Sequence, residues 1–168
     1  MMTNYCYHPS PIGRLLLVGD DEGLRRLHLD EAEPWERPAD WREDPGRFGE
    51  LRRQLDEYFA GRRRRFEARL APRGTEFQQA VWTALRDIPF GRTESYGGLA
   101  ARIGRPKAVR AVGAANGANP IAIVIPCHRV IGGDGRLVGY GGGLARKEFL
   151  LRLEGCRQSG SSPGTGGI

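Results

Sequence analysis

The pattern of apolar and polar positions in the first part of the chain predicts a small sheet followed by one helix. Two apolar stretches, Leu15–Val18 and Leu24–Leu29, flank the polar segment Gly19–Gly23, which is typical of a β-hairpin. Apolar side chains then recur at helical spacing over Phe48–Phe59, so we predict an amphipathic helix there. The intervening residues, Glu31–Gly46, are rich in proline, tryptophan and charge, and we expect them to form a surface connection.

The second part of the chain has the spacing of several short helices. Thr75 and Gln78 form a capping box at the start of a helix that continues to about Leu85. Two more helices are predicted over 95–103 and 106–116, and the second of them begins with a proline, which suits a first helical position. Two short helices joined by a tight turn are a candidate helix-turn-helix.

A run of five apolar residues, Ile121–Ile125, predicts a short strand that Pro126 ends. Cys127 follows directly, so we expect its side chain where the backbone turns out of the core. A glycine-rich loop, Gly139–Gly143, then leads into a last predicted helix, Leu144–Glu154, which is followed by a glycine.

Cys127 is the strongest candidate for chemistry, because His128 and Arg129 follow it in the chain. A thiol acts as a nucleophile in its thiolate form, and neighbouring positive charge lowers its pKa. We therefore predict a reactive thiol with a lowered pKa. The alternative is a structural cysteine at the end of a strand.

Glu154 lies in the last turn of a predicted helix, where the helix dipole disfavours a carboxylate. A cationic or hydrogen-bonding partner would offset this cost, and His128 is the obvious candidate. The resulting Glu154–His128–Cys127 relay would fix the tautomer of the histidine and give the thiol a base. A surface glutamate without such a role is the alternative.

Charge is unevenly distributed in this chain of net charge +6. Residues 1–70 contain 13 arginines and 14 acidic residues, whereas residues 71–168 contain 13 basic and 6 acidic residues. A basic half with a helix-turn-helix indicates a polyanionic partner, and nucleic acid is the first candidate.

Lys107, Arg110 and Ala114 share one face of the second predicted helix, whose other residues are mostly small. We infer binding by shape and phosphate contact with little sequence preference, unless the alanines pack inside.

The remaining residues argue against other classes of site. Cys6, Cys127 and Cys156 make an odd number of cysteines, so we expect free thiols in a reducing cytoplasm. The longest aliphatic run is five residues, far too short for a membrane span. Cys6 and His8 are too few for a closed zinc site, and the glycine-rich loop lacks the pattern of a phosphate loop. We therefore expect no metal, no cofactor and no membrane contact.

Several motifs together resemble the O6-alkylguanine-DNA alkyltransferases, the methylated-DNA–protein-cysteine methyltransferases. The most specific is Pro126–Ile131, with the sequence PCHRVI, followed by Gly139–Leu144 and Lys147-Glu148. Arg110–Gly113 and Asn119-Pro120 stand at the spacing of the family upstream. The resemblance covers the chain except its last residues.

The resemblance implies an α+β fold of two domains. Residues 1–72 would form a ribonuclease-H-like domain with a small β-sheet and a helix. Residues 73–156 would form a mostly helical, winged-helix-like domain that carries the helix-turn-helix. The segment 157–168, rich in serine and glycine, is expected to be a disordered tail.

The resemblance also implies an activity, namely stoichiometric transfer of an alkyl group from O6 of guanine in duplex DNA to Cys127. The protein would bind the minor groove as a monomer and flip the damaged base. His128 would act through water and be held by Glu154, while Asn119 would brace the loop. Expected substrate- and DNA-binding residues are Arg110 as an intercalating finger, Tyr96 beside the target's 3′ phosphate or base, Tyr140 as a pocket wall, the backbone of Val130 and Gly141, Asn116 and Lys147.

Two other functions remain as alternatives at the level of the sequence. One is a DNA-binding regulator that uses Cys127 as an alkylation sensor, and the other is a thiol hydrolase with a Cys–His–Glu triad. Asn116 stands where some relatives have an apolar residue, which leaves the range of alkyl groups open. Activity on O4-alkylthymine and cooperative binding of several copies are open as well.

Overall fold

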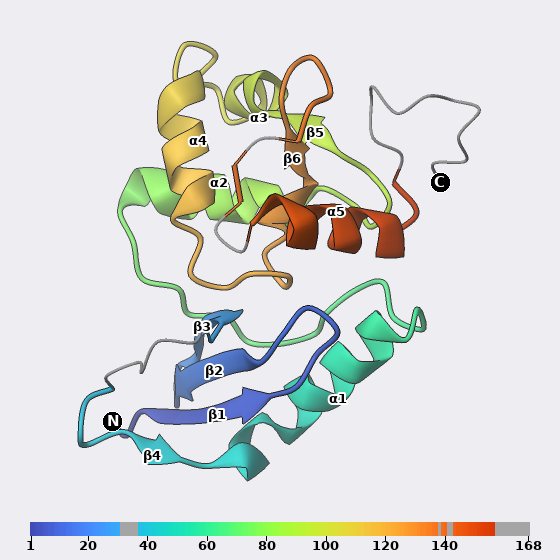
Figure 1. Cartoon of the computed structure of the whole chain (residues 1–168). Helices are drawn as coiled ribbons and strands as arrows, with labels where there is room; N and C mark the ends of the chain where they lie inside the picture. The colour runs from blue at the N-terminus through green and yellow to red at the C-terminus, as the bar shows by residue number, and fades with distance from the viewer. Residues whose placement is uncertain (31–36, 138, 141–142, 157–168) are drawn as a thin grey trace. The chain divides into compact units, whose positions relative to one another are not determined.

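The computed structural model describes residues 1–30, 37–137, 139–140 and 143–156. Contacts within the chain divide it into an N-terminal unit, Met1–Arg73, and a C-terminal unit, Gly74–Ile168. The first contains a sheet and a helix and the second is mainly helical (Figure 1), which confirms the expected α+β class. Gly141 and the segment 157–168 lie outside the described residues.

The sheet of the N-terminal unit has the strand order β3-β2-β1-β4. The predicted hairpin is confirmed, since β2 and β3 are antiparallel, as are β1 and β2. β4 pairs in parallel with β1 in the segment that we expected to be a connection, so that prediction was wrong in part. A two-residue strand leaves no alternating pattern to detect. The strands are β1 Asn4–His8, β2 Leu15–Asp20, β3 Gly23–Leu29 and β4 Arg42–Glu43.

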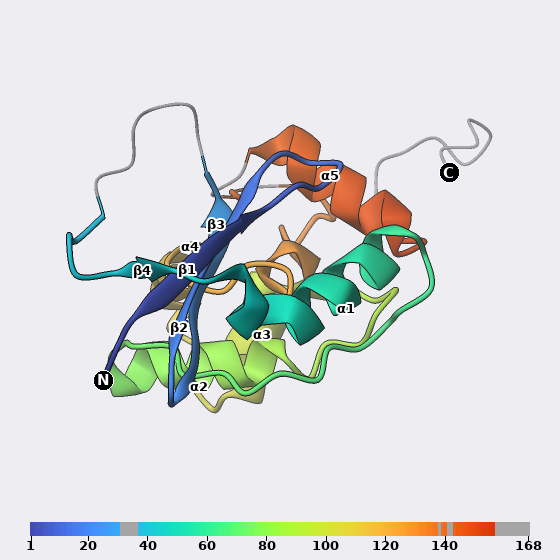
Figure 2. The same cartoon turned by 90° about the horizontal axis from the view of Figure 1, so that it is seen from below.

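The predicted helix is α1, Gly49–Phe59, preceded by the short 3-10 helix η1, Pro45–Phe48. Its side chains reach one face of the sheet, because Nε2 of His8 lies 2.7 Å from Oδ1 of Asp56. Arg52 donates from Nε to Nδ1 of His8 at 3.1 Å. Figure 2, which views the chain from below, shows α1 running alongside the strands.

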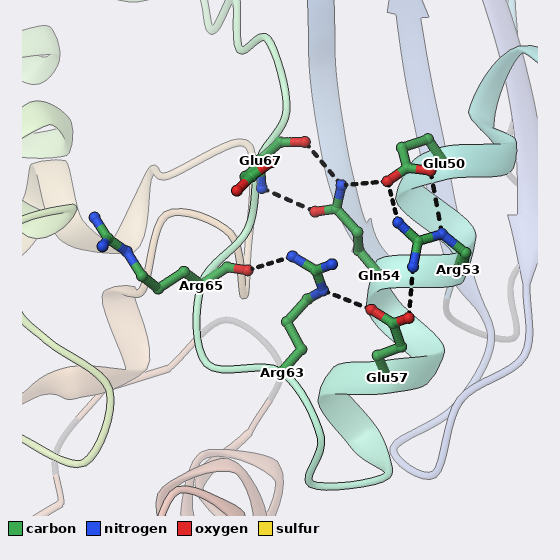
Figure 3. Close-up of polar contacts among 7 residues, drawn as sticks. All are labelled: Glu50, Arg53, Gln54, Glu57, Arg63, Arg65 and Glu67. Atoms are coloured by element: carbon green, nitrogen blue, oxygen red, sulfur yellow. Dashed lines mark hydrogen bonds and ion pairs between the residues drawn. The ribbon is translucent and has the colours of Figure 1, made fainter.

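A polar network joins α1 to the chain segment that follows it (Figure 3). Gln54 is buried, donates from Nε2 to the carbonyl of Glu67 at 2.8 Å and accepts from the backbone N–H of Glu67 at 2.9 Å. Residues 62–65 are four consecutive arginines. Arg63 among them donates to Glu57 at 2.8 Å and to the carbonyl of Arg65 at 2.8 Å, so it has a structural role within the N-terminal unit.

The C-terminal unit follows the predicted order of helices. The capping box is confirmed, because Thr75 and Gln78 bond reciprocally at the start of the first helix. Trp82 on that helix donates from Nε1 to the carbonyl of Ala115 at 2.8 Å and ties the first helix to the third. The elements are α2 Glu76–Leu85, β5 Glu94–Ser95, α3 Tyr96–Arg102, α4 Val109–Gly117, the 3-10 helix η2 Cys127–Arg129, β6 Val130–Ile131 and α5 Leu144–Leu153.

Two elements of this unit differ from the prediction. The run 121–125 forms turns instead of a strand, with Ile123 at φ 72° and the amide of Ile125 donating to the carbonyl of Ile121 at 3.0 Å. The helix expected from residue 106 begins at Val109, because residues 105–108 form a turn closed by the amide of Ala108 and the carbonyl of Arg105 at 2.9 Å. The proline at 106 thus occupies the second position of a turn, which its fixed φ also suits.

The described residues include no helix with the length and hydropathy needed to cross a membrane. Within the same residues, no group of three or more histidine, cysteine or acidic side chains is arranged to bind a metal ion. All three cysteines are free thiols.

Candidate active site

Cys127 is the first residue of η2, and two asparagines hold the backbone around it. Asn116 on α4 donates from Nδ2 to the carbonyl of Cys127 at 3.3 Å. Asn119 donates from Nδ2 to the carbonyl of Ile125 at 2.8 Å and accepts from the amide of Ile121 at 3.0 Å. The side chain of Asn119 alone thus makes two bonds to the turn that precedes Cys127, and these contacts are the bracing that we expected of this residue.

The environment of Cys127 differs from the expected one in two ways. The residue is buried, with 7% of its surface exposed, so it does not turn out of the core. Burial raises the pKa of its thiol, and this outweighs the opposing effects of a hydrogen bond from Asn119 and the charge of Lys147. The prediction of a lowered pKa was therefore wrong, because the neighbouring Arg129 points to a different partner.

That partner is Glu154, which caps the end of α5 and is also buried. Nε2 of His128 lies 2.7 Å from Oε2 of Glu154, which is the contact predicted from the helix-dipole argument. Arg129 donates from Nε to Oε1 at 2.8 Å and from Nη2 to Oε2 at 3.0 Å. The carboxylate of Glu154 therefore contacts both the imidazole of His128 and the guanidinium of Arg129, whereas the sequence predicted only the contact with His128.

These contacts set the protonation of the pair. Burial alone would raise the pKa of Glu154, but the hydrogen bonds and charges of His128 and Arg129 lower it to about 2. Burial lowers the pKa of His128, and the charges of Arg129 and Lys147 add to this effect against the opposing influence of Glu154. Nδ1 of His128 has no hydrogen-bond partner among the described residues. The result is an ionised carboxylate, a neutral imidazole and one free ring nitrogen.

Two tyrosines stand near the thiol. Tyr96 begins α3, and burial raises the pKa of its hydroxyl against a hydrogen bond from Asn116. Burial also raises the pKa of Tyr140 in the glycine-rich loop, with a further contribution from the charge of Cys127. Because Cys127 in its thiolate form would raise the pKa of both hydroxyls, both rings belong to the surroundings of the sulfur.

Lys147 on α5 lies inside the unit and not on its surface. Its ammonium donates to the carbonyl of Val130 at 2.6 Å and to the carbonyl of Gly139 at 3.3 Å, and its side chain is fully buried. Burial lowers its pKa to about 8, against the charge of Cys127. Lys147 therefore joins the glycine-rich loop to β6. Its expected role among the substrate- and DNA-binding residues stays a prediction, and its burial near Cys127 favours a place beside the substrate over a contact with a DNA phosphate.

The other expected residues fall in two groups. Val130 is buried in β6, which pairs in parallel with β5, and Asn116 is buried with its Oδ1 unpaired among the described residues. Arg110 and Ala114 are exposed on α4. Lys107 is exposed as well, but it lies in the turn before α4, so the prediction that it shares a helix face with them was wrong. The opposite face of α4 packs inward through Val112, Ala115 and Asn116. The alternative that the alanines pack inside therefore holds for only one side of the helix.

Comparison with known proteins places the two parts of the chain in one family. Residues 4–72 match the model of the 6-O-methylguanine DNA methyltransferase ribonuclease-like domain, and residues 76–156 match the DNA binding domain of the same family. A methylated-DNA–protein-cysteine methyltransferase from Methanosarcina acetivorans is 54% identical over 152 residues, covering 90% of this chain and 97% of that protein. One from Mycobacterium tuberculosis is 51% identical over 156 residues, covering 93% and 94%.

Solved structures agree with the sequence matches. The crystal structure of the Mycobacterium tuberculosis O6-methylguanine methyltransferase matches with a TM-score of 0.85 and 49% identity, over 97% of this chain and 96% of that one. A structure of the Mycobacterium tuberculosis protein in complex with DNA matches with a TM-score of 0.84 and 52% identity, over 90% and 92%. The chain belongs to the 6-O-methylguanine DNA methyltransferase family.

Proposed function

We propose that this protein repairs DNA by moving an alkyl group from O6 of guanine to Sγ of its own Cys127, once per molecule. The observation that carries this proposal is the buried thiol beside a neutral histidine whose other nitrogen is held by an ionised glutamate. A thiol with a raised pKa is inert until a base removes its proton, and His128, the next residue in the chain, is such a base.

The transfer is a single displacement in which one bond forms and one breaks. The proton leaves Sγ of Cys127 for Nδ1 of His128, directly or through one water molecule. The sulfur electron pair then forms the S–C bond, and the pair of the C–O6 bond leaves with the guanine, which takes up a proton. The thioether product is stable, so the protein is consumed. Tyr96 and Tyr140 would line the space for the flipped base, and Asn119 would keep the turn in place.

DNA would be bound through α3 and α4 in the minor groove with little sequence preference. The exposed face of α4 carries Arg110 among small residues, and Lys107 is exposed in the turn before the helix, so the helix backbone can approach the duplex closely. Arg110 would enter the stack in place of the flipped base, whose unstacking costs a few kcal/mol. We also propose that one copy acts on one lesion, and that the protein works in the cytoplasm, where its free thiols stay reduced.

Intact-protein mass spectrometry tests the proposal. After incubation with duplex DNA that contains O6-methylguanine, we expect a gain of one methyl group that peptide mapping places on Cys127. The variant Cys127→Ala should gain nothing, whereas the matched control Cys156→Ala should gain the methyl group as the native chain does. Repaired DNA with an unchanged protein mass, or several repairs per molecule, would contradict the proposal and favour a hydrolase.

A further inference from the structure

Arg129 is a charged side chain inside the candidate active site that the transfer just described does not use. Only 7% of its surface is exposed. Besides its two bonds to Glu154, it donates from Nη1 to the carbonyl of Ile88 at 2.6 Å. Its guanidinium also lies near the ring of Phe90, 5.9 Å from the centroid. Burying a guanidinium is costly unless its donors are paired, and here all three nitrogens are engaged.

These contacts join three separate pieces of chain. Arg129 belongs to η2, Glu154 ends α5, and Ile88 lies in the loop between α2 and β5. The guanidinium is planar and its two bonds to the carboxylate are parallel, so they fix both the position and the rotation of the carboxylate plane. Histidine alone, through a single bond, would leave that rotation free.

The bidentate contact also decides what Glu154 can do for His128. A carboxylate paired with a guanidinium stays ionised, and an ionised carboxylate only accepts hydrogen bonds. At 2.7 Å, Nε2 of His128 must therefore be the donor. In a neutral imidazole the other nitrogen then carries the lone pair, and that nitrogen is Nδ1, which has no partner among the described residues.

Arg129 has a second effect through its charge. The charged and titratable groups that face His128 are Glu154 and Lys147 from α5, and Arg129 and Cys127 from its own turn. A glutamate alone would favour the imidazolium form. The two cations oppose it, so the imidazole remains neutral and able to accept a proton.

We propose that Arg129 is a positioning residue that keeps Glu154 a pure acceptor and thereby holds His128 as the neutral tautomer protonated at Nε2, which leaves Nδ1 to take the proton of Cys127. The inference rests on the proposed alkyl transfer for its consequence, but the tautomer itself is a property of the free protein. The tautomer of His128 and the alkyl transfer to Cys127 can therefore be disproved independently of each other.

The first test is nitrogen NMR of the native protein with ¹⁵N-labelled histidine, with His128→Asn used to assign the signals among the three histidines. At about pH 7, we expect His128 to be neutral with its proton on Nε2. A proton on Nδ1, or an imidazolium at this pH, would overturn the inference and leave the mass-spectrometric result on Cys127 untouched. The decisive signal comes from the native protein without DNA, and His128→Asn serves only to assign it.

The second test is the pH dependence of single-turnover alkyl transfer in Arg129→Met and Arg129→Lys. Without the guanidinium, the pKa of His128 rises and the imidazolium form is favoured. As the pH is lowered, the transfer rate of Arg129→Met should therefore begin to fall at a pH about one unit higher than in the native protein. Its loss relative to the native protein should therefore be about tenfold larger at the acid end of the profile than at the alkaline end. Arg129→Lys keeps the charge and should recover most of this shift, though not the full rate.

Arg152→Met is the matched control, because Arg152 is exposed on α5 and pairs with Glu148. Its profile should coincide with that of the native protein. A loss in Arg129→Met by the same factor at every pH would indicate a role in folding alone and contradict the inference. If Arg129→Met does not fold, the native NMR signal and the profile of Arg129→Lys decide the question.

Discussion

Cys127 combines burial with reactivity, and the two fit together. Burial raises the pKa of the thiol, so at neutral pH the sulfur is protonated and protected from chance alkylation or oxidation. In the proposed mechanism the proton leaves when His128 accepts it, and the bonds that Glu154 makes to His128 and Arg129 would hold the imidazole in place for this step. On this proposal, the reactivity of the thiol depends on four residues and not on the cysteine alone.

Glu154 should make the stability of the C-terminal unit depend on pH. Its pKa is about 2 in the folded chain and about 4.5 in its ordinary state, so it stabilises the fold above about pH 4.5 and this contribution is lost as the pH falls toward 2. We expect Glu154→Gln to lower the free energy of unfolding by about 3 kcal/mol at neutral pH, since it leaves a buried guanidinium unpaired. The difference from the native protein should shrink over this acid range, as followed by denaturant unfolding with Trp35 and Trp41 replaced by phenylalanine in both proteins, so that fluorescence reports Trp82 alone.

Glu148→Gln provides the control for this measurement, because Glu148 lies on the same helix and its partner Arg152 is exposed. Its effect should stay within about 0.5 kcal/mol at every pH, as is usual for a surface pair. An equal loss for Glu154→Gln at neutral and acid pH would show that the ionised carboxylate is not the source of the stability.

At the scale of elements, the sequence predicted what local signals specify. The hairpin has its turn residues, α2 has its capping box, and α1 has an apolar stripe. The run 121–125 was misread because its apolar residues are buried in turns that the side chain of Asn119 holds together, a contact six residues away that no periodicity records. Arg129 was missed for the same reason, since its partners lie 25 and 41 positions away.

Arg110 on α4 gives this element a test of its own. If its side chain replaces the flipped base, Arg110→Ala should slow repair of O6-methylguanine in duplex DNA at least about tenfold, since an unstacking cost of a few kcal/mol is no longer offset. Reaction with the free base O6-benzylguanine needs no flipping and should change little. Stopped-flow transfer rates on the two substrates give the comparison, with Arg152→Ala as a control that removes one charge from another helix. Equal losses on both substrates would argue against the finger.

The whole molecule divides its charge between the two units. The basic excess lies in residues 71–168, while the arginines of the N-terminal unit are balanced by acidic residues. Arg63 and Arg53 illustrate the balance, because both bond to Glu57 (Figure 3). A unit that neutralises its own charge releases few counterions from DNA, so the salt dependence of binding should come mainly from the other unit.

The salt dependence of binding to undamaged duplex DNA therefore separates the two units. Each phosphate contact adds about one to the slope of log K against log salt concentration. We expect Lys107→Ser, on the exposed face next to α4, to reduce the slope by about one unit. Arg65→Ser is the matched control, because it removes one exposed charge from the arginine run of the N-terminal unit, and it should leave the slope unchanged. Fluorescence anisotropy at several salt concentrations gives the slope for each variant. A lower slope for Arg65→Ser would indicate that the N-terminal unit also contacts DNA phosphates, and it would contradict the argument from the balanced charge of that unit.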